Sequence, residues 1–398
     1  MNLKILSFII AFTTSVFSAF AVNKSVLKVV DRSLSVCAAQ YGLMAEKLKS
    51  QPGLLPKSFD NNGKFITSDA KWWCSGFFPG TLWYLYEFNK IYSVKKNAEL
   101  FSERIKGEQF TTDNHDIGFV MYCSYGNAFR LDPKNEYKQI VVNTAKSLST
   151  RFNPKVGLIR SWDWGKWQYP VIIDNMMNLE LLFNATKFSG DSLYYKIAVE
   201  HAEKTMKNHF RDDASCYHVV SYDKLSGLPE YKETWQGFSD SSSWARGQAW
   251  AIYGYTMTYR ETCDHRFLNQ AIRIANYLLN HPRMPKDLIP YWDFDAPNIP
   301  NALRDASAGA VICSALIELS RYVKGKESKR FLKAAETQLL TLSSPTYLAK
   351  IGENGNFILK HSVGFLPKNS EVDVPLTYAD YYFVEALMRY KKYNPNPR

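Results

Sequence analysis

The chain is organised around the segment Trp244-Ala-Arg-Gly-Gln-Ala-Trp250, in which one arginine lies between two tryptophans. Apolar side chains continue from it at helical spacing through Tyr253. A guanidinium can hold a carboxylate in a planar fork, and aromatic rings can cover the C–H faces of a sugar. The segment therefore predicts a helix whose first turn faces an acidic ligand such as a charged sugar ring. The alternative is a core helix with one surface arginine, because aromatic side chains at helical spacing usually belong to a core.

Helical patterns recur on both sides of this segment. They cover residues 26–48, 72–92, 95–105, 119–129, 137–151, 173–187, 192–209, 244–261, 266–280, 306–322, 327–342 and 378–392. Apolar and amphipathic stretches alternate along the series, which is typical of an all-α toroid of paired inner and outer helices. Residues 51–69 are rich in Pro, Gly, Asn and Ser and are expected to form a loop. Short strands are expected at 217–222 and 355–360, as hairpins at one rim.

The N-terminus has the pattern of a cleaved secretion signal. Lys4 precedes a mainly apolar run over residues 5–17, and Ala19-Phe-Ala21 supplies the small residues of a cleavage site. Removal of residues 1–21 leaves 398 − 21 = 377 residues without a Pro/Ser linker or a charge block, so we expect one domain over residues 22–398. The protein is expected to be periplasmic or secreted. It should not be a membrane protein, because no later apolar run reaches about 18 residues.

Net charge indicates the class of partner, and cysteine spacing indicates the state of the thiols. Without the signal segment the formal net charge falls from +11 to 48 − 38 = +10, which favours anionic partners such as acidic polysaccharide. The basic residues are scattered, which argues against nucleic-acid binding. The six cysteines show no CxxC spacing and are expected to be mostly free, buried thiols.

Two aspartates lie in apolar surroundings at predicted helix starts. Asp116 is part of His115-Asp-Ile-Gly-Phe119, and Asp174 is part of Val171-Ile-Ile-Asp-Asn-Met-Met177. Desolvation near a second carboxylate would raise the pKa of either acid and allow it to deliver a proton near neutral pH. The alternative, which does not exclude this role, is that each aspartate caps a helix N-terminus.

Other chemistries lack their motifs. A zinc site would need HExxH or paired cysteines, and a serine nucleophile would favour GxSxG; neither pattern occurs, and residues 241–243 are expected to cap the helix that follows. Phosphate loops and dinucleotide fingerprints are also missing, so no metal or cofactor is expected. His218 and Gln236 are polar residues in aromatic surroundings, and each taken alone is more typical of a structural role. Acid–base chemistry by carboxylates on a ligand held by aromatic rings and arginine indicates glycoside chemistry.

Several motifs, in order along the chain, resemble glycoside hydrolase family 88, the unsaturated glucuronyl hydrolases. They are Gly76-Phe-Phe-Pro-Gly80, His115-Asp-Ile-Gly-Phe119, Ile172-Ile-Asp-Asn175, Tyr217-His-Val-Val220, Trp244-Ala-Arg-Gly-Gln-Ala-Trp250 and the closing segment from Asp373 to Leu387. The resemblance implies an (α/α)6 barrel. It also implies hydrolysis of oligosaccharides that a lyase has left with a C4=C5 unsaturated uronic acid at the non-reducing end, such as chondroitin, hyaluronan or heparin fragments.

The resemblance also implies roles for individual residues. Asp174 matches the general acid and base of the family, and Asp116 matches its second essential aspartate. Residues that match the subsite for the unsaturated uronate are His218, Gln236, Arg246 and Trp250. Trp162 matches an aromatic residue that stacks at the mouth, although Trp164 and Trp167 leave that identity open.

One departure from the family pattern concerns sulfate. Members that accept sulfated fragments carry Ser-x-x-Ser-x-Lys after a His-Ser-Val segment, whereas His361-Ser-Val-Gly-Phe-Leu-Pro-Lys368 lacks those serines. Lys368 remains a candidate sulfate contact.

Two alternative functions stay open. One is an unsaturated rhamnogalacturonyl hydrolase, whose segment usually reads Arg-Gly-Asn-Gly-Trp where this chain has Arg246-Gly-Gln-Ala-Trp250. The other is a non-catalytic glycan-binding toroid.

Overall fold

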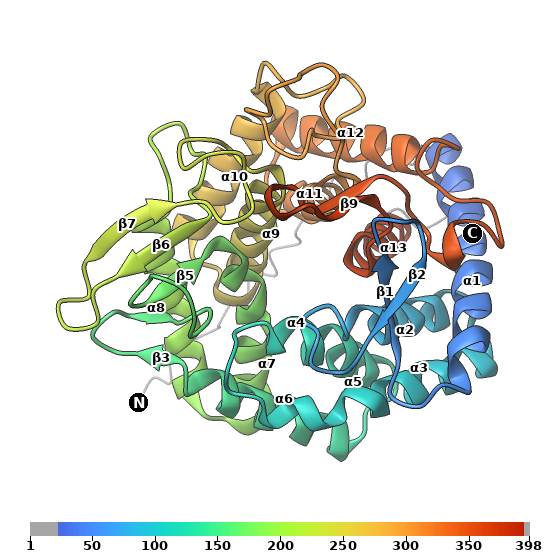
Figure 1. The fold of residues 1–398 in the computed structure, drawn as a ribbon, viewed down its shortest axis with the longest axis horizontal. Helices are drawn as coiled ribbons and strands as arrows, with labels where there is room; N and C mark the ends of the chain where they lie inside the picture. The colour runs from blue at the N-terminus through green and yellow to red at the C-terminus, as the bar shows by residue number, and fades with distance from the viewer. Residues whose placement is uncertain (1–22, 394–398) are drawn as a thin grey trace, which may run out of the picture.

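The computed structural model describes residues 23–393. The secretion signal expected over residues 1–21 lies outside this range, as do residues 22 and 394–398 of the expected domain. The described chain forms the (α/α)6 barrel expected from the alternating helices, with an inner ring of helices surrounded by an outer ring (Figure 1).

The inner ring is formed by helices that begin at one end of the barrel. They are α2 (Phe77–Asn89), α4 (Ile117–Met121) with α5 (Asn127–Leu131), α7 (Leu179–Ser189), α9 (Ala245–Thr262), α11 (Ala306–Leu319) and α13 (Thr377–Tyr393). A π-helical turn, η2 (Tyr122–Gly126), joins α4 to α5, and a 3-10 helix, η3 (Ile173–Asn178), precedes α7. Contact between α13 and α2 closes the ring.

The outer ring alternates with the inner one along the chain. Its helices are α1 (Lys24–Lys49), α3 (Tyr92–Ile105), α6 (Asn135–Ser149), α8 (Ser192–Asn208), α10 (His265–Asn280) and α12 (Gly325–Leu342). Helix α11 is buried along its whole length, whereas α10 buries one face through residues such as Phe267, Ala271 and Ile274. This difference in burial produces the alternation of apolar and amphipathic stretches in the sequence.

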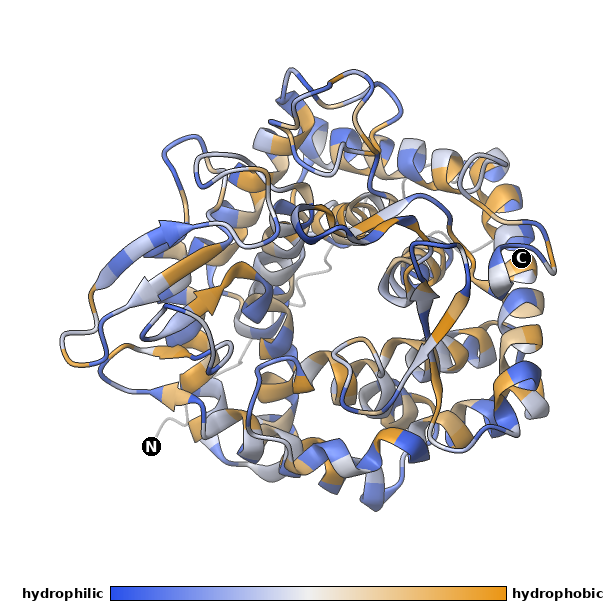
Figure 2. Ribbon diagram, viewed as in Figure 1, coloured by the Kyte–Doolittle hydropathy of each residue, from blue (hydrophilic) through white to orange (hydrophobic). Residues whose placement is uncertain are grey.

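Short antiparallel hairpins lie at the end of the barrel where the inner helices begin (Figure 1). They pair β1 (Leu55–Phe59) with β2 (Phe65–Ser68), β3 (Phe152–Asn153) with β4 (Leu158–Ile159), and β8 (Ser362–Phe365) with β9 (Ser370–Val374). A three-stranded sheet has the order β5 (Pro170–Ile172), β6 (Val219–Tyr222), β7 (Pro229–Glu233). Figure 2 shows apolar residues on β5 and β6 and a polar β7, which agrees with the buried first two strands and the largely exposed third.

Two predictions for the rim are wrong. Residues 51–69 form the β1–β2 hairpin, because the Asp60 carboxylate accepts the N–H groups of Asn62 and Lys64 and confines the turn to the polar residues. No strand covers residues 355–360; the strand is β8, which begins at Ser362. Positive φ angles at Asn354 (55°) and Asn356 (72°) prevent an extended start there.

The six cysteines are free, as expected, and all are buried except the exposed Cys263. Among residues 23–393, no helix is both long and apolar enough to cross a membrane.

Candidate active site

The candidate residues gather where the inner helices begin. Asp116 immediately precedes α4, Asp174 lies in η3 ahead of α7, and Arg246 is in the first turn of α9. The capping alternative for the two aspartates is wrong. Asp116 occupies the N-cap position without a side-chain hydrogen bond to the helix, and the N-cap of η3 is Ile172.

Asp174 is a buried acid, 7% exposed, whose Oδ2 atom has no hydrogen-bond partner in the described structure. Burial raises the pKa of its carboxyl to about 7; the charge of Arg246 opposes this rise, and the charge of Asp116 adds to it. Asp174 can therefore give or take a proton near neutral pH.

Asp116 provides the second acid. Its side chain is 22% exposed, and its Oδ1 atom lies 3.4 Å from Nε2 of His115. Burial raises the pKa of this carboxyl to about 7, while the charge of Arg151 opposes the rise. Because the charge on Asp116 raises the pKa of Asp174, the two acids titrate as a coupled pair.

His218 presents an N–H group to Asp174. Its Nδ1 atom accepts the backbone N–H groups of Trp235 and Gln236, at 3.0 and 3.1 Å. Burial, followed by the charge of Arg246, lowers the pKa of the imidazole to about 3, so the ring is neutral at neutral pH. A neutral ring that accepts at Nδ1 carries its proton on Nε2, which lies 3.7 Å from Oδ2 of Asp174.

Arg246 is deeply buried, 1% exposed, so the alternative of a surface arginine is wrong. Its guanidinium donates to the carbonyl oxygens of Val363 and Gly364, the latter at 2.6 Å, and to Oδ2 of Asp305 at 3.4 Å. The Arg246 side chain thus anchors strand β8 to the start of α9. A guanidinium has five N–H donors, and only those that these three bonds do not use can bind the carboxylate of a substrate, as predicted.

Trp250 and Gln236 lie beside these groups. Trp250 is fully buried against Phe119 and Tyr382, with ring centroids 5.3 and 5.4 Å away, and its Nε1 has no hydrogen-bond partner in the described structure. The side-chain amide of Gln236 donates to the carbonyl of Gly364 at 3.4 Å. Trp250 is thus a wall residue, and Gln236 joins the loop before α9 to β8.

A cluster of aromatic side chains forms the rim next to His218. The rings of Trp162 and Trp164 stack with centroids 4.7 Å apart and an angle of 11°. Trp162 is 8% exposed, whereas Trp164 is 50% exposed and offers the open ring face. Trp235 packs against Trp164, and the Lys368 ammonium lies 5.1 Å from the centre of the Trp235 ring. Lys368 is therefore placed at the aromatic rim.

Sequence reasoning missed three polar contributors, His115, Asn175 and Glu371. His115 and Asn175 belong to motifs quoted for their aspartates, and their mutual hydrogen bond of 2.6 Å joins residues 60 positions apart. Glu371 is a third carboxylate whose charge acts on Arg246, and its pKa is raised by burial. It lies in a polar strand with no motif around it.

The predicted serine cap before α9 is also wrong. The N-cap residue is Trp244, without a side-chain capping bond, and Ser242 instead donates to Oδ2 of Asp293 at 2.7 Å. Within residues 23–393, no three His, Cys, Asp or Glu side chains are grouped so as to hold a metal ion.

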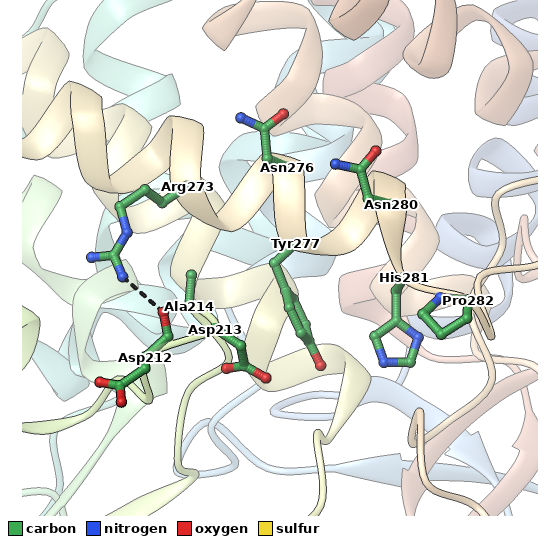
Figure 3. A pocket seen from close by; sticks show the side chains of 9 residues that line it. All are labelled: Asp212, Asp213, Ala214, Arg273, Asn276, Tyr277, Asn280, His281 and Pro282. Carbon is green, nitrogen blue, oxygen red and sulfur yellow. Dashed lines mark hydrogen bonds between the residues drawn. The ribbon is translucent and has the colours of Figure 1, made fainter.

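Two cavities are lined by residues other than the aspartate pair. One, of about 620 Å³, extends inside the barrel from Gly118 and Met177 to Arg260, Glu318 and Arg389 at the opposite end. The other, of about 550 Å³, is an open surface pocket beside α10 (Figure 3). It is lined by Asp212, Asp213, Ala214, Arg273, Asn276, Tyr277, Asn280, His281 and Pro282. None of the predicted site residues lines either cavity.

Comparisons with known proteins agree with this arrangement. An unsaturated glucuronyl hydrolase from Formosa agariphila is 50% identical over 325 residues, covering 80% of each chain. An unsaturated chondroitin disaccharide hydrolase from Streptococcus pneumoniae is 34% identical over 344 residues, covering 85% of this chain and 86% of its own. The crystal structure of an unsaturated glucuronyl hydrolase specific for heparin superposes with a TM-score of 0.89 and 49% identity, over 92% of this chain and 97% of that one. The sequence model of Glycosyl Hydrolase Family 88 matches residues 55–397. The chain is therefore a glycoside hydrolase that belongs to glycosyl hydrolase family 88.

Proposed function

We propose that this enzyme removes the 4,5-unsaturated uronic acid from the non-reducing end of lyase-generated glycosaminoglycan oligosaccharides. The observation that carries the proposal is the coupled pair Asp116 and Asp174, two acids with pKa values of about 7 at the start of neighbouring inner helices. The activities named for the relatives support it.

The reaction is hydration of the C4=C5 vinyl ether. Asp174 donates a proton to C4, and positive charge develops at C5 and the ring oxygen. Water then adds at C5 while the Asp174 carboxylate takes a proton from it. The resulting hemiketal opens, and the glycosidic bond breaks. Because nothing is displaced at the anomeric carbon, the separation of the carboxyl groups does not predict a stereochemical outcome as it does for ordinary glycosidases.

The charges around the pair suit a developing cation. An ionised Asp116 stabilises positive charge at C5, and the His218 N–H stabilises the carboxylate that Asp174 becomes after it has donated its proton. Arg246 would oppose the cation, but its charge is partly balanced by the Val363 and Gly364 carbonyls and by Asp305.

The substrates that we propose are unsaturated heparin, chondroitin or hyaluronan fragments. A panel of lyase-generated disaccharides with defined sulfation, assayed by loss of absorbance of the conjugated double bond, tests the proposal. An unsaturated uronate linked to a neutral sugar and an unsaturated rhamnogalacturonan disaccharide complete the panel. Turnover of the rhamnogalacturonan fragment alone would show that the pectin-directed alternative is correct.

Sulfate preference is tested at Lys368. If its ammonium contacts a sulfate, Lys368→Ala raises KM for sulfated disaccharides and leaves KM for the unsulfated ones unchanged. Equal effects on both classes would exclude a sulfate-specific contact.

We also propose that the enzyme is exported to the periplasm or the medium. The pattern of residues 1–21 supports this proposal. When the chain is expressed with its own N-terminus, the mature protein should begin at Val22 and should leave the cytoplasm. Recovery of the full-length chain in the cytoplasm would contradict export.

A further inference from the structure

A buried hydrogen-bond chain fixes the protonation of His115. The side-chain amide nitrogen of Asn175 donates to the Ile159 carbonyl at 2.7 Å and to the Ser161 hydroxyl at 3.2 Å. A carbonyl oxygen can only accept, so the Asn175 nitrogen points toward Ile159 and its Oδ1 atom faces His115. The Oδ1 atom lies 2.6 Å from Nδ1 of His115 and must receive a hydrogen from it.

His115 therefore carries its proton on Nδ1 and has a bare lone pair on Nε2. The ring is 2% exposed, and burial lowers its pKa to about 3, so it does not take a second proton near neutral pH. The lone pair of Nε2 lies 3.4 Å from Oδ1 of Asp116. His218 has the opposite tautomer, with its N–H directed at Asp174.

The two histidines consequently favour different states of the two acids. An N–H group beside a carboxyl favours the ionised form, and a lone pair beside a carboxyl favours the protonated form. The other charges that act on the pair are those of Arg151, two residues beyond α6, and Arg246, on α9. Arg151 is itself paired with the Asp163 carboxylate at 2.9 Å, and this pairing weakens the effect of its charge on the pKa of Asp116.

We propose that His115 is a positioning residue for the proton of the aspartate pair: its bare Nε2, fixed by Asn175, accepts the carboxyl hydrogen of Asp116. In the substrate-free enzyme the pair then holds its proton on Asp116 and leaves Asp174 ionised against His218. The contact of 3.4 Å shortens to a hydrogen bond by a small rotation of the Asp116 side chain, as is common for groups that tighten on substrate binding.

The proposal rests on the proposed function in one respect, since Asp174 must be protonated when it acts on C4. The proton then moves within the pair after the substrate has bound: the O–H bond on Asp116 breaks and one forms on Asp174. This transfer leaves Asp116 as the carboxylate that faces the developing positive charge. This proton transfer from Asp116 to Asp174 consumes no other reactant.

The tautomers are tested in the full chain without substrate. Two-bond proton–nitrogen correlation spectra of enzyme labelled with ¹⁵N-histidine distinguish Nδ1–H from Nε2–H rings, and His115→Gln and His218→Gln assign the two signals. We expect His115 as the Nδ1–H form and His218 as the Nε2–H form near neutral pH. An Nε2–H or doubly protonated His115 would overturn the proposal, whether or not the enzyme turns over any substrate.

The resting place of the proton is tested by titrating ¹³C-labelled aspartate carboxyls, assigned with Asp116→Asn and Asp174→Asn. Asp116 should lose its proton at higher pH than Asp174. His115→Phe removes the lone pair and should lower the pKa of Asp116 by roughly one unit. Asn175→Asp should also lower it, because a carboxylate behind His115 favours the imidazolium.

The control is His281→Phe, which changes a partly buried histidine whose ring lies against Phe294, outside the aspartate site. It should leave both aspartate pKa values unchanged. An Asp116 that ionises before Asp174 in the unmodified enzyme overturns the proposal. So does a pKa of Asp116 that His115→Phe leaves where it was.

Discussion

At the scale of single residues, the chemistry depends on groups that face each carboxyl from other segments. Asp174 lies 3.7 Å from the N–H-bearing atom of His218, and Asp116 lies 3.4 Å from the bare nitrogen of His115. Both acids have raised pKa values because burial penalises their charged forms. The same residue type thus acquires two different surroundings within one site.

Asp174→Asn should lower kcat/KM by about 10²–10⁴-fold, because the amide cannot supply the proton to C4. The folded structure should persist, since the Asp174 carboxyl oxygen Oδ2 makes no hydrogen bond. Steady-state kinetics and circular dichroism measure the two effects. Asp191→Asn, a change of the same type at the N-cap of α8, should leave kcat/KM unchanged, and equal losses in both variants would contradict the assignment.

The pH dependence of kcat/KM should show an alkaline limb near pH 7. Activity requires the one proton that Asp116 and Asp174 share, and the pKa values of about 7 set the pH above which the pair loses that proton. Each further pH unit should lower kcat/KM about tenfold. A profile that rises through pH 8 would show that a different group donates the proton.

Arg246→Ala should destabilise the fold by about 3–5 kcal/mol, the usual result of removing one partner from a buried ionic cluster. The variant removes one donor each from Asp305 and from the carbonyls of Val363 and Gly364. Denaturant unfolding provides the measurement. Arg273→Ala, at an exposed position of α10, is the matched control and should cost less than about 1 kcal/mol. A similar cost for both variants would show that Arg246 does not anchor β8.

At the scale of elements, the inner helices start so close together that their first turns require glycine. A Cβ atom on Gly76 would lie 2.0 Å from the Val120 carbonyl oxygen, and one on Gly118 would lie 2.5 Å from Oδ1 of Asn178. These contacts bring α2, α4 and η3 together at the end that carries Asp116 and Asp174.

Gly76→Ala should therefore cost at least about 1–3 kcal/mol, because the added methyl group meets backbone that cannot move away. Gly42→Ala is the matched control in the outer helix α1, where a Cβ would meet nothing within 4 Å. It should raise stability by about 0.5–1 kcal/mol, the difference between Ala and Gly in a helix. A melting temperature that falls for Gly76→Ala and rises for Gly42→Ala would confirm the packing argument. A Gly76→Ala variant that is more stable than the unmodified enzyme would refute it.

At the scale of the whole molecule, an ionic network ties the inner helices together at the end opposite the site. Glu318 on α11 accepts from Arg260 on α9 at 2.8 and 3.0 Å and pairs with Arg389 on α13 at 2.8 Å. Arg260 also pairs with Glu180 on α7. Burial alone would raise the pKa of Glu318, but the two arginines outweigh it and lower the pKa to about 2.

This lowered pKa predicts a pH-dependent contribution to stability. The contribution is fully present above the unfolded value of 4.5 and is lost as the pH falls through about 2. Glu318→Gln should lower the free energy of unfolding by about 3 kcal/mol at pH 7, and the difference from the unmodified enzyme should shrink as the pH falls from 4.5 to 2. Denaturant titrations at a series of pH values measure it.

The control for the network is Glu46→Gln, which changes an exposed glutamate paired with Lys49. It should change stability by less than about 1 kcal/mol at any pH. A loss for Glu318→Gln that stays constant down to pH 2 would mean that its charge is not what stabilises the network.

The sequence by itself determined the features that depend on local pattern. The alternation of apolar and amphipathic stretches predicts the paired helices. A helix that is buried on all sides, such as α11, is apolar throughout, whereas a helix that is buried on one face, such as α10, has apolar residues at helical spacing. The apolar surroundings of Asp116 and Asp174 likewise indicated acids with raised pKa values, and the structure agrees.

Only the tertiary structure decided which groups face each other. Arg246 meets Gly364 across 118 positions of sequence, and His115 meets Asn175 across 60, so neither the anchoring of β8 nor the tautomer of His115 follows from local pattern. The choice of Trp164 as the exposed ring depends on its stacking over Trp162. Hydrogen-bond direction and exposure are properties of contacts between segments, and these contacts exist only once the barrel has closed.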